Sequence, residues 1–451
     1  MPVVQMMQRG LVSYLLRQGR VVDPANSVDL IADVYLADGR IAAIGHSLSI
    51  DGALEIDCRG FVVCPGLIDL HAHLRVPGFE HKETIESGTS AAAAGGFTTV
   101  CCMPNTLPPL DQPSVVLDLL SEIQKHALVS VLPIGTISKG REGLEPVDYA
   151  ALAEAGVVGF SDDGDSTLDA AVMLEALEAS KTLSLPVMVH CEERGLIGGV
   201  MHEGDVSREL GLKGLPAEAE ELILARDILL AEKTGGWLYA LHVSTAYGAG
   251  MVRAAKARGV HISAEVMPHH LVMTDHWVAG RRELVNVDEL GGQPVSAPDP
   301  LAKVNPPLRP EADSVGLLAA VLDGTFDVIA TDHAPHAMTE KTGLPIEHAA
   351  FGINGFETAL PLMLGLVRAG HISMSEMVSL MSYRPANLMG FDSGRLTPGA
   401  VADVTVFDPD ASWRIEPGSL KTLSPNTPLV GMTVRGRVMM TFVGGSLQHE
   451  A

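Results

Sequence analysis

The sequence predicts an α/β protein: a (β/α)₈ TIM barrel with a small, discontinuous β-sandwich-like domain built from both ends of the chain. Two observations support this. Between residues 62 and 370 short apolar runs alternate with helical patterns, and both ends of the chain show short strands separated by turns. The first pattern is typical of parallel α/β folds. A doubly wound open sheet is the alternative, although no Gly-x-Gly-x-x-Gly fingerprint favours it.

Eight apolar runs are predicted to be buried parallel strands. They span residues 62–70, 97–103, 127–135, 157–160, 185–190, 237–243, 260–266 and 326–331. Amphipathic patterns with helical spacing lie between them and after the last one. The clearest cover residues 83–96, 114–127, 168–180, 217–235, 248–259 and 357–370. Eight strand–helix units in this length indicate a barrel.

The two ends differ from this middle part. Residues 14–60 and 396–447 alternate in short strands punctuated by Gly, Pro and Asp. Two β segments that flank a barrel most simply pair with each other. We therefore expect residues 1–62 and 393–451 to form the small β domain and residues 63–392 to form the barrel. The opening MPVVQMMQRGLVSYLL has no clear cleavage site, so we expect an extension that leads into a strand rather than a signal peptide.

Composition narrows the class of protein. The formal charge of −24 over 451 residues argues against nucleic acid or an anionic membrane as a partner. The content of 47% hydrophobic and 19% charged residues is typical of a soluble globular chain. Five cysteines without CxxC spacing favour buried thiols in a reducing, cytoplasmic setting. No apolar stretch approaches the roughly 20 residues of a membrane span.

Polar residues gather at the ends of the predicted strands. The residues concerned are His71, His73, Asp162, Asp163, His190, His242, Asp332, His333 and His336. Each alone has an ordinary explanation, such as a structural histidine, an Asx turn or a helix N-cap. Together they fall at the carboxyl ends of strands, where barrel enzymes carry their chemistry.

Imidazole and carboxylate are ligands that suit Zn²⁺ and similar divalent ions. Four histidines and two aspartates exceed the needs of one tetrahedral site. With one bridging carboxylate, they suffice for two metal ions. The sequence therefore predicts a binuclear metal centre at the rim of the barrel.

Several motifs resemble the cyclic amidohydrolases, specifically dihydroorotases of the bacterial class I type. They are PGLIDLHAHLRVPGFEHKETIESGTSAAAAGGFTTVCCMPNT, FSDDG, VHCEERGLIGG, ARDILLAEKTG, HVST, AEVMPHHL, VNPPLRP, ATDHAPH, FGINGFETALPL and TPGAVADVTVFD. The resemblance covers about residues 14–447. It implies a zinc-dependent enzyme that reversibly hydrolyses the ring amide of dihydroorotate to N-carbamoyl-L-aspartate, the third step of pyrimidine biosynthesis.

The resemblance also implies the ligands of two zinc ions per chain. These are His71, His73, Asp163, His190, His242 and Asp332. Asp332 would also act as catalytic acid and base. Many relatives bridge the metals with a carboxylated lysine on strand four, but residues 157–163 contain no lysine. The class I pattern uses Asp163 instead, ahead of Asp162.

Arg75 follows the two histidines of the first strand and distinguishes this interpretation from its rivals. A guanidinium can bind the carboxylate of dihydroorotate bidentately. The substrate-binding residues implied by the resemblance are His73, Arg75, Asn105, Asn305, His336, Phe351 and Gly352. Without the family, a surface salt bridge for Arg75 and turns for the asparagines are the plainer interpretations. His269 and His270 are expected to be structural.

Two alternatives remain open. Another cyclic amidohydrolase, a dihydropyrimidinase or allantoinase, is disfavoured by Arg75 and by the missing lysine. A catalytically silent dihydroorotase-like subunit that supports aspartate transcarbamoylase is disfavoured because no expected ligand is absent. We expect a homodimer that can associate with aspartate transcarbamoylase. Residues 191–215 and 336–348 are long enough to act as lids.

Overall fold

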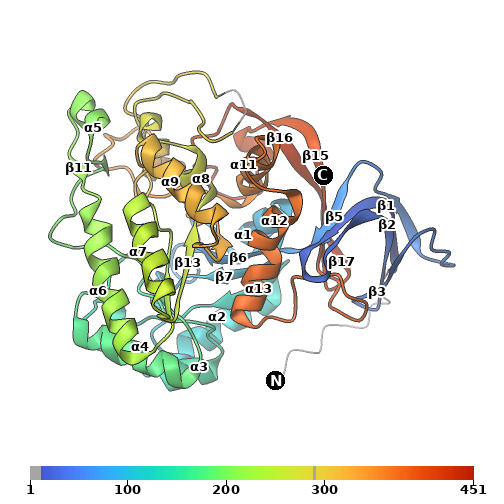
Figure 1. Cartoon of the computed structure of the whole chain (residues 1–451), viewed down its shortest axis with the longest axis horizontal. Coiled ribbons are helices and arrows are strands. Elements are labelled where there is room, and N and C mark those ends of the chain that lie inside the picture. The colour runs from blue at the N-terminus through green and yellow to red at the C-terminus, as the bar shows by residue number, and fades with distance from the viewer. Residues whose placement is uncertain (1–11, 288–290) are drawn as a thin grey trace.

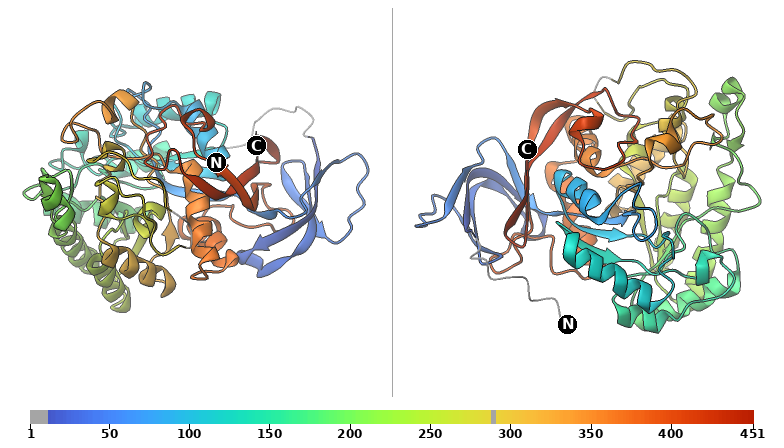
Figure 2. Two further views of the ribbon diagram at one scale, coloured as in Figure 1. Left: turned by 90° about the horizontal axis from the view of Figure 1, so that it is seen from above. Right: turned by 180° about the vertical axis from the view of Figure 1, so that it is seen from behind.

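The computed structural model describes residues 12–287 and 291–451 (Figure 1). Most of the expected N-terminal extension, residues 1–11, lies outside the described residues. Helices surround a central sheet, and a second sheet built from both ends of the chain stands at one side of it (Figures 1 and 2). Within the described residues, no helix has the length and apolar character that a membrane crossing requires.

The central sheet is a closed barrel. Its strands are β6 (Leu67–Ala72), β7 (Phe97–Cys102), β8 (Ser130–Pro133), β9 (Val187–Val189), β12 (Leu238–Ala240), β13 (Ile262–Val266) and β14 (Val328–Ile329). Parallel ladders run in the orders β6-β7-β8 and β9-β12-β13-β14. Phe160 bridges the two ladders by pairing with Gly135 and Val187, and the Ala72–His333 bridge joins the opposite edges. The predicted barrel is confirmed.

Two of the predicted strands differ in detail. The run 157–160 forms only the bridges at Phe160. The run is short because a helix ends just before it at the left-handed Gly156. A turn begins just after it, where Asp165 N donates to Asp162 O. The run 62–70 divides at Gly66. Its first part, β5 (Val62–Pro65), pairs with the terminal sheet, and its second part is β6. A Cβ at Gly66 would lie 2.1 Å from Thr98 Oγ1, so the crossing requires glycine.

The helices follow the predicted periodicity with ends displaced by a few residues. They are α1 (Ile85–Ala94), α2 (Pro113–His126), α3 (Tyr149–Ala155), α4 (Ala170–Leu183), α5 (Asp205–Leu210), α6 (Glu218–Thr234), α7 (Ala246–Ala257), α8 (Pro268–Val272), α9 (Glu311–Leu322), α10 (Met338–Lys341), α11 (Phe356–Arg368), α12 (Met374–Val378) and α13 (Arg384–Met389). Thr84 and Thr245 cap α1 and α7 by accepting backbone N–H bonds. Two short strands, β10 (Met201–His202) and β11 (Gly214–Leu215), pair with each other in the connection between β9 and α6.

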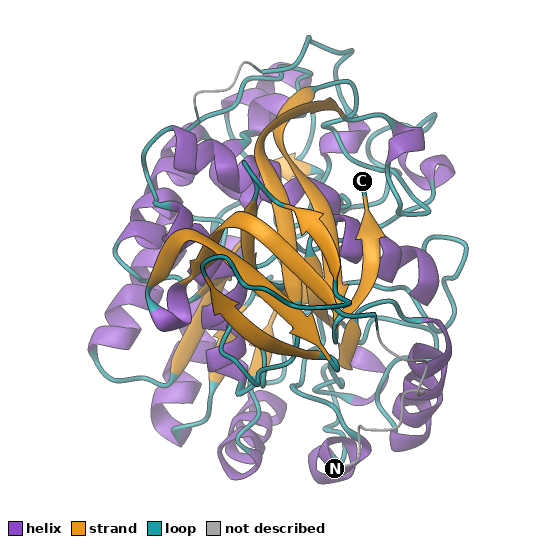
Figure 3. Cartoon of the chain, turned by 90° about the vertical axis from the view of Figure 1, so that its right-hand side faces the viewer, coloured by secondary structure: helices purple, strands orange, loops and turns teal. Residues whose placement is uncertain are grey.

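The terminal segments form one sheet in the order β17-β16-β15-β5-β1-β2-β3, with β4 beside β1 (Figure 3). Its strands, in addition to β5, are β1 (Tyr14–Asp23), β2 (Val28–Ala37), β3 (Arg40–Gly45), β4 (Leu54–Asp57), β15 (Val404–Arg414), β16 (Thr433–Val443) and β17 (Ser446–Glu450). The sheet has a core of its own, which includes Leu16, Val34, Val63, Val404 and Phe442. The predicted pairing of the two ends is confirmed.

Candidate binuclear metal centre and active site

The end of β6 carries the first two histidines. His71 and His73 are buried, and their ring centroids are 5.5 Å apart. Side chains two apart in a strand share a face, which here is the face inside the barrel mouth. His190 follows β9 and His242 follows β12, so both reach the same mouth from neighbouring strands.

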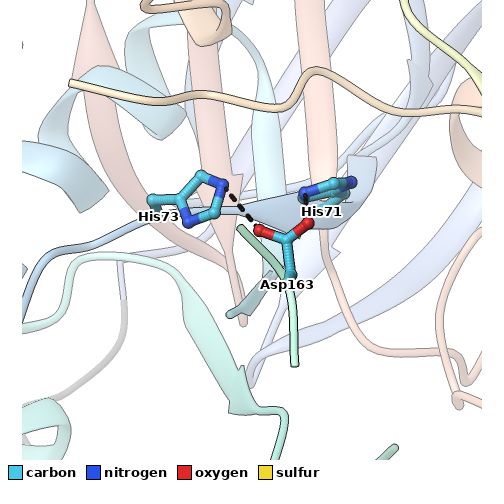
Figure 4. A group of neighbouring side chains, drawn as sticks. All are labelled: His71, His73 and Asp163. Carbon is cyan, nitrogen blue, oxygen red and sulfur yellow. Dashed lines mark ion pairs between the residues drawn. The ribbon is translucent and has the colours of Figure 1, made fainter. Parts of the chain in front are cut away.

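Asp163 lies at the centre of these four histidines. His71 Nε2 and His242 Nε2 are each 3.6 Å from Asp163 Oδ1, and His190 Nδ1 is 3.5 Å from it. His73 faces the other carboxylate oxygen, Oδ2 (Figure 4), and the distance from its Nε2 to that oxygen is 3.4 Å. One group of ligand atoms comprises His71, His73 and Asp163, and a second comprises Asp163, His190 and His242. Two buried sites that share one carboxylate are consistent with a binuclear metal centre.

The donor atoms fit divalent cations. His71 Nε2 and Asp163 Oδ1 are buried and have no hydrogen-bond partner among the residues that the structure describes. Buried polar atoms are nearly always paired, so such atoms facing one another require a further occupant. Imidazole nitrogen and carboxylate oxygen are the ligand types that bind zinc and related ions.

Asp332 follows β14 and faces the same Nε2 atoms of His71 and His73 as Asp163 does. Its Oδ1 is 3.0 Å from His73 Nε2 and 3.5 Å from His71 Nε2. Burial would raise the pKa of Asp332, but the charge of His71 and the hydrogen bond with His73 outweigh it and lower that pKa. Asp332 and His242 have φ angles of 48° and 30°, a left-handed backbone that is costly for these residues and is found at functional sites.

Sequence reasoning missed the buried carboxylate that orients His71. Glu265 on β13 lies with its Oε1 2.7 Å from His71 Nδ1, and its Oε2 accepts a hydrogen bond of 2.8 Å from Tyr239 Oη. A carboxylate at Nδ1 keeps the proton there and leaves Nε2 free as a ligand. The signal was a lone acidic residue inside the apolar run 260–266.

Other polar residues near the rim have different partners. The Asp162 carboxylate accepts hydrogen bonds from Ile137 N, Ser138 N and Thr167 Oγ1, so it stabilises a loop and does not face the histidines. His333 stacks on Phe356 at 4.0 Å between ring centroids and faces Glu83. His269 and His270 are buried behind the site, and His270 Nε2 lies 3.0 Å from Pro306 O.

A pocket of about 640 Å³ opens over the metal-binding groups. Every residue predicted to bind substrate lines it: His73, Arg75, Asn105, Asn305, His336, Phe351 and Gly352. The Arg75 Nε donates to Pro335 O at 3.0 Å, and its Nη2 is 3.2 Å from His336 Nε2. Burial lowers the pKa of Arg75 to about 10, against the nearby carboxylates of Asp332 and Asp163, which raise it. The guanidinium therefore stays charged at neutral pH.

Two further cations that the sequence reasoning did not single out, Lys82 and Arg141, also line this pocket. Lys82 Nζ is 3.3 Å from Glu340 Oε1, and Arg141 Nη2 is 2.6 Å from Asp165 Oδ2. Both of these cations are thus paired with carboxylates, whereas Arg75 forms no ion pair with a carboxylate in the described part of the chain. Arg75 is therefore the lining cation best able to bind an anionic ligand.

Comparison with known proteins agrees with this geometry. The family described as Dihydro-orotase-like matches residues 60–247. The dihydroorotase of Geobacter sp. (strain M21) is 44% identical over 442 residues, covering 98% of this chain and 100% of that protein. The dihydroorotase of Pelotomaculum thermopropionicum is 45% identical over 433 residues, covering 96% of this chain and 97% of that protein.

The chain belongs to the dihydroorotase family. It is therefore a hydrolase, as the resemblance in its motifs predicted. Solved structures share this fold. The L-hydantoinase (dihydropyrimidinase) of Arthrobacter aurescens superposes with a TM-score of 0.84 at 24% identity, covering 97% of this chain and 96% of that one. The dihydropyrimidinase of Brevibacillus agri NCHU1002 gives 0.82 at 23% identity, covering 97% and 95%.

Proposed function

We propose that this dihydroorotase-family chain reversibly hydrolyses the ring amide of dihydroorotate to N-carbamoyl-L-aspartate, the third step of pyrimidine biosynthesis. The observation that supports this substrate is the buried Arg75 guanidinium in the wall of the pocket that also holds Asp163. Dihydroorotate carries a carboxylate that dihydrouracil lacks. A charged guanidinium in a largely desolvated wall favours the ring that carries this group.

We propose that two Zn²⁺ ions bind per chain. The residues that would hold them are His71, His73 and Asp332 for the first, His190 and His242 for the second, and Asp163 for both. Bound there, divalent ions supply Lewis acidity that acidifies water and polarises a carbonyl. Glu265 holds the Nδ1 proton of His71 and so keeps Nε2 directed at the centre.

Asp332 is the proposed proton carrier. Its carboxylate is ionised, because the nearby histidines lower its pKa, and it lies at the pocket wall. It accepts a proton from the attacking water as the new C–O bond forms at the ring carbonyl. It then donates that proton to the ring nitrogen as the C–N bond breaks. Ring closure in the synthetic direction follows the same steps in reverse.

Arg75, Asn105 and His336 are proposed to bind the substrate carboxylate, and Asn305 with the backbone of Phe351 and Gly352 to bind the ring. Burial, together with the positive charges of Arg75 and Lys82, lowers the pKa of His336 far below neutrality. His336 is therefore neutral. It can donate or accept a hydrogen bond without a change of charge.

Steady-state kinetics with dihydroorotate, dihydrouracil and allantoin test the assignment. The zinc-loaded protein should hydrolyse dihydroorotate and favour it over the other two rings. Preference for dihydrouracil or allantoin would make the chain another cyclic amidohydrolase. Failure on all three rings with both metal sites filled would favour a silent subunit that supports aspartate transcarbamoylase.

We further propose a cytoplasmic homodimer that can associate with aspartate transcarbamoylase. The five cysteines are free, buried thiols, which fits a reducing compartment. Light scattering of the purified chain, alone and mixed with the transcarbamoylase of the same organism, measures both states. A monomer at micromolar concentration, or two non-interacting peaks in the mixture, would remove the corresponding proposal.

A further inference from the structure

Two buried lysines that the proposed mechanism does not use lie in the sequence on either side of β14. Lys341 ends α10 and is 0% exposed, and Lys303, from the segment before Asn305, is 2% exposed. In the described part of the chain, neither ammonium group forms an ion pair with a carboxylate. Lysine is almost never fully buried without a partner, so these two positions require an explanation.

The partners of both lysines are backbone carbonyls. Lys341 Nζ donates to Lys303 O at 2.9 Å, Ala350 O at 2.8 Å and Gly352 O at 2.9 Å. An ammonium group has three donors and no acceptor, so Lys341 is fully paired as a cation.

Lys303 Nζ makes the corresponding set of contacts. It donates to Ile346 O at 2.8 Å, Ala349 O at 2.7 Å and Glu347 O at 3.3 Å. It also lies 4.2 Å from the centroid of the Phe351 ring. The carbonyls bound by the two lysines thus belong to residues 346–352 and to Lys303 itself.

These carbonyls flank the part of the backbone that faces the pocket. Phe351 and Gly352 line the pocket, as does Asn305, two residues after Lys303. Gly352 N donates to Lys303 O at 3.0 Å, so the carbonyl that accepts from Lys341 also accepts from the pocket backbone. Asn426 Nδ2 also donates to Gly352 O, at 3.1 Å.

We propose that Lys303 and Lys341, here called the lysine bracket, are positioning residues that hold the backbone of Phe351 and Gly352 against Asn305 for substrate binding. The inference rests on the proposed function. Burying two ammonium groups costs desolvation, and apolar side chains of similar volume often serve stability as well or better. In return, the loop is ordered before the substrate binds. Substrate binding then does not have to offset the entropy cost of ordering the loop.

The test is Lys341→Met in the full chain loaded with zinc. Because Lys303 O keeps its bond from Gly352 N and Gly352 O keeps its bond from Asn426 Nδ2, the fold should survive. We expect KM for dihydroorotate to rise at least about tenfold, while kcat changes less than about threefold and zinc content stays the same. A purely structural lysine would lower Tm and leave KM unchanged.

Lys256→Met is the control. Lys256 Nζ pairs with Asp327 Oδ2 at 2.7 Å, directly before β14, and Lys256 does not line the pocket. This variant should leave KM unchanged, whatever it does to Tm. If KM rises as much in Lys256→Met as in Lys341→Met, the effect comes from removing a lysine in general, and the proposal is overturned.

Lys303→Met provides a second, independent variant, and it should also raise KM selectively. If both lysine variants keep the wild-type KM, or if both fail to fold by circular dichroism, the bracket is not a positioning device. The wild-type protein separates the two proposals. Failure of the wild type to turn over dihydroorotate defeats the proposed function, whereas wild-type turnover with unchanged KM in the variants defeats only this inference.

Discussion

The two sides of the pocket are built in different ways. On the metal side, histidines stand at or directly after β6, β9 and β12, and a buried carboxylate behind them, Glu265, fixes His71. On the substrate side, Phe351 and Gly352 lie on a long connection that buried donors hold by its carbonyls. Strand ends give rigid placement from local structure, whereas a loop needs long-range contacts to reach the same precision.

The largest effect is expected on the metal side. Asp332→Asn should lower turnover in both directions by roughly 10²–10⁴-fold, because a carboxamide cannot carry the proton. The protein should remain folded, since the replacement has the same shape. Initial rates in both directions and circular dichroism measure this. Activity within tenfold of wild type would remove Asp332 from the role of acid and base.

On the substrate side, the largest loss of activity is expected from Arg75→Ala. Truncating one partner of a buried charge pair costs roughly 2–5 kcal/mol. At about 1.4 kcal/mol per tenfold, kcat/KM on dihydroorotate should fall by about two orders of magnitude or more, with little change on dihydrouracil. Arg75→Lys should recover part of the loss, since an ammonium lacks the planar fork. Zinc content should not change. An equal loss on both rings would mean that Arg75 shapes the pocket without binding the carboxylate.

A smaller effect is expected behind the metal ligands. Glu265→Gln should weaken zinc affinity about 10–100-fold, because an amide is a poorer acceptor for the Nδ1 proton of His71. The matched control is Glu83→Gln, a buried carboxylate 3.5 Å from the ring of His333 and outside the metal groups. Competition with a chromogenic chelator measures both affinities. Equal weakening in the two variants would indicate a global change of the fold.

The smallest expected effect is on the pH dependence of substrate binding. A histidine in water becomes protonated as the pH falls below its ordinary pKa of about 6.5. Because the pocket lowers the pKa of His336, this residue stays neutral there even below pH 6.5. KM for dihydroorotate should therefore show no inflection from His336 between about pH 6 and 8. An inflection near 6.5 that disappears in His336→Gln would show that the folded protein does protonate this residue.

The sequence located the metal side more completely than the substrate side. The spacing of His71 and His73 and the strand-end positions of Asp163, His190 and His242 were enough to predict that these side chains share one rim. Glu265 was not predicted, because one acidic residue in an apolar run does not reveal which residue it contacts. Lys303 and Lys341 were not predicted for a different reason: their partners are backbone carbonyls, and carbonyls have no sequence signature.

By itself the sequence determined the alternation of strand and helix, the pairing of the two ends, and the set of polar side chains at the carboxyl ends of the strands. These depend on hydrophobic periodicity, which is local. Only the tertiary structure decided that the sheet closes through bridges at Phe160 and at Ala72 with His333, that Glu265 contacts His71, and that buried lysines donate to carbonyls of the pocket backbone. Each of these depends on which group becomes the hydrogen-bond partner of a buried polar atom once the chain has packed. These partners are far apart in the sequence, so neither periodicity nor spacing predicts them.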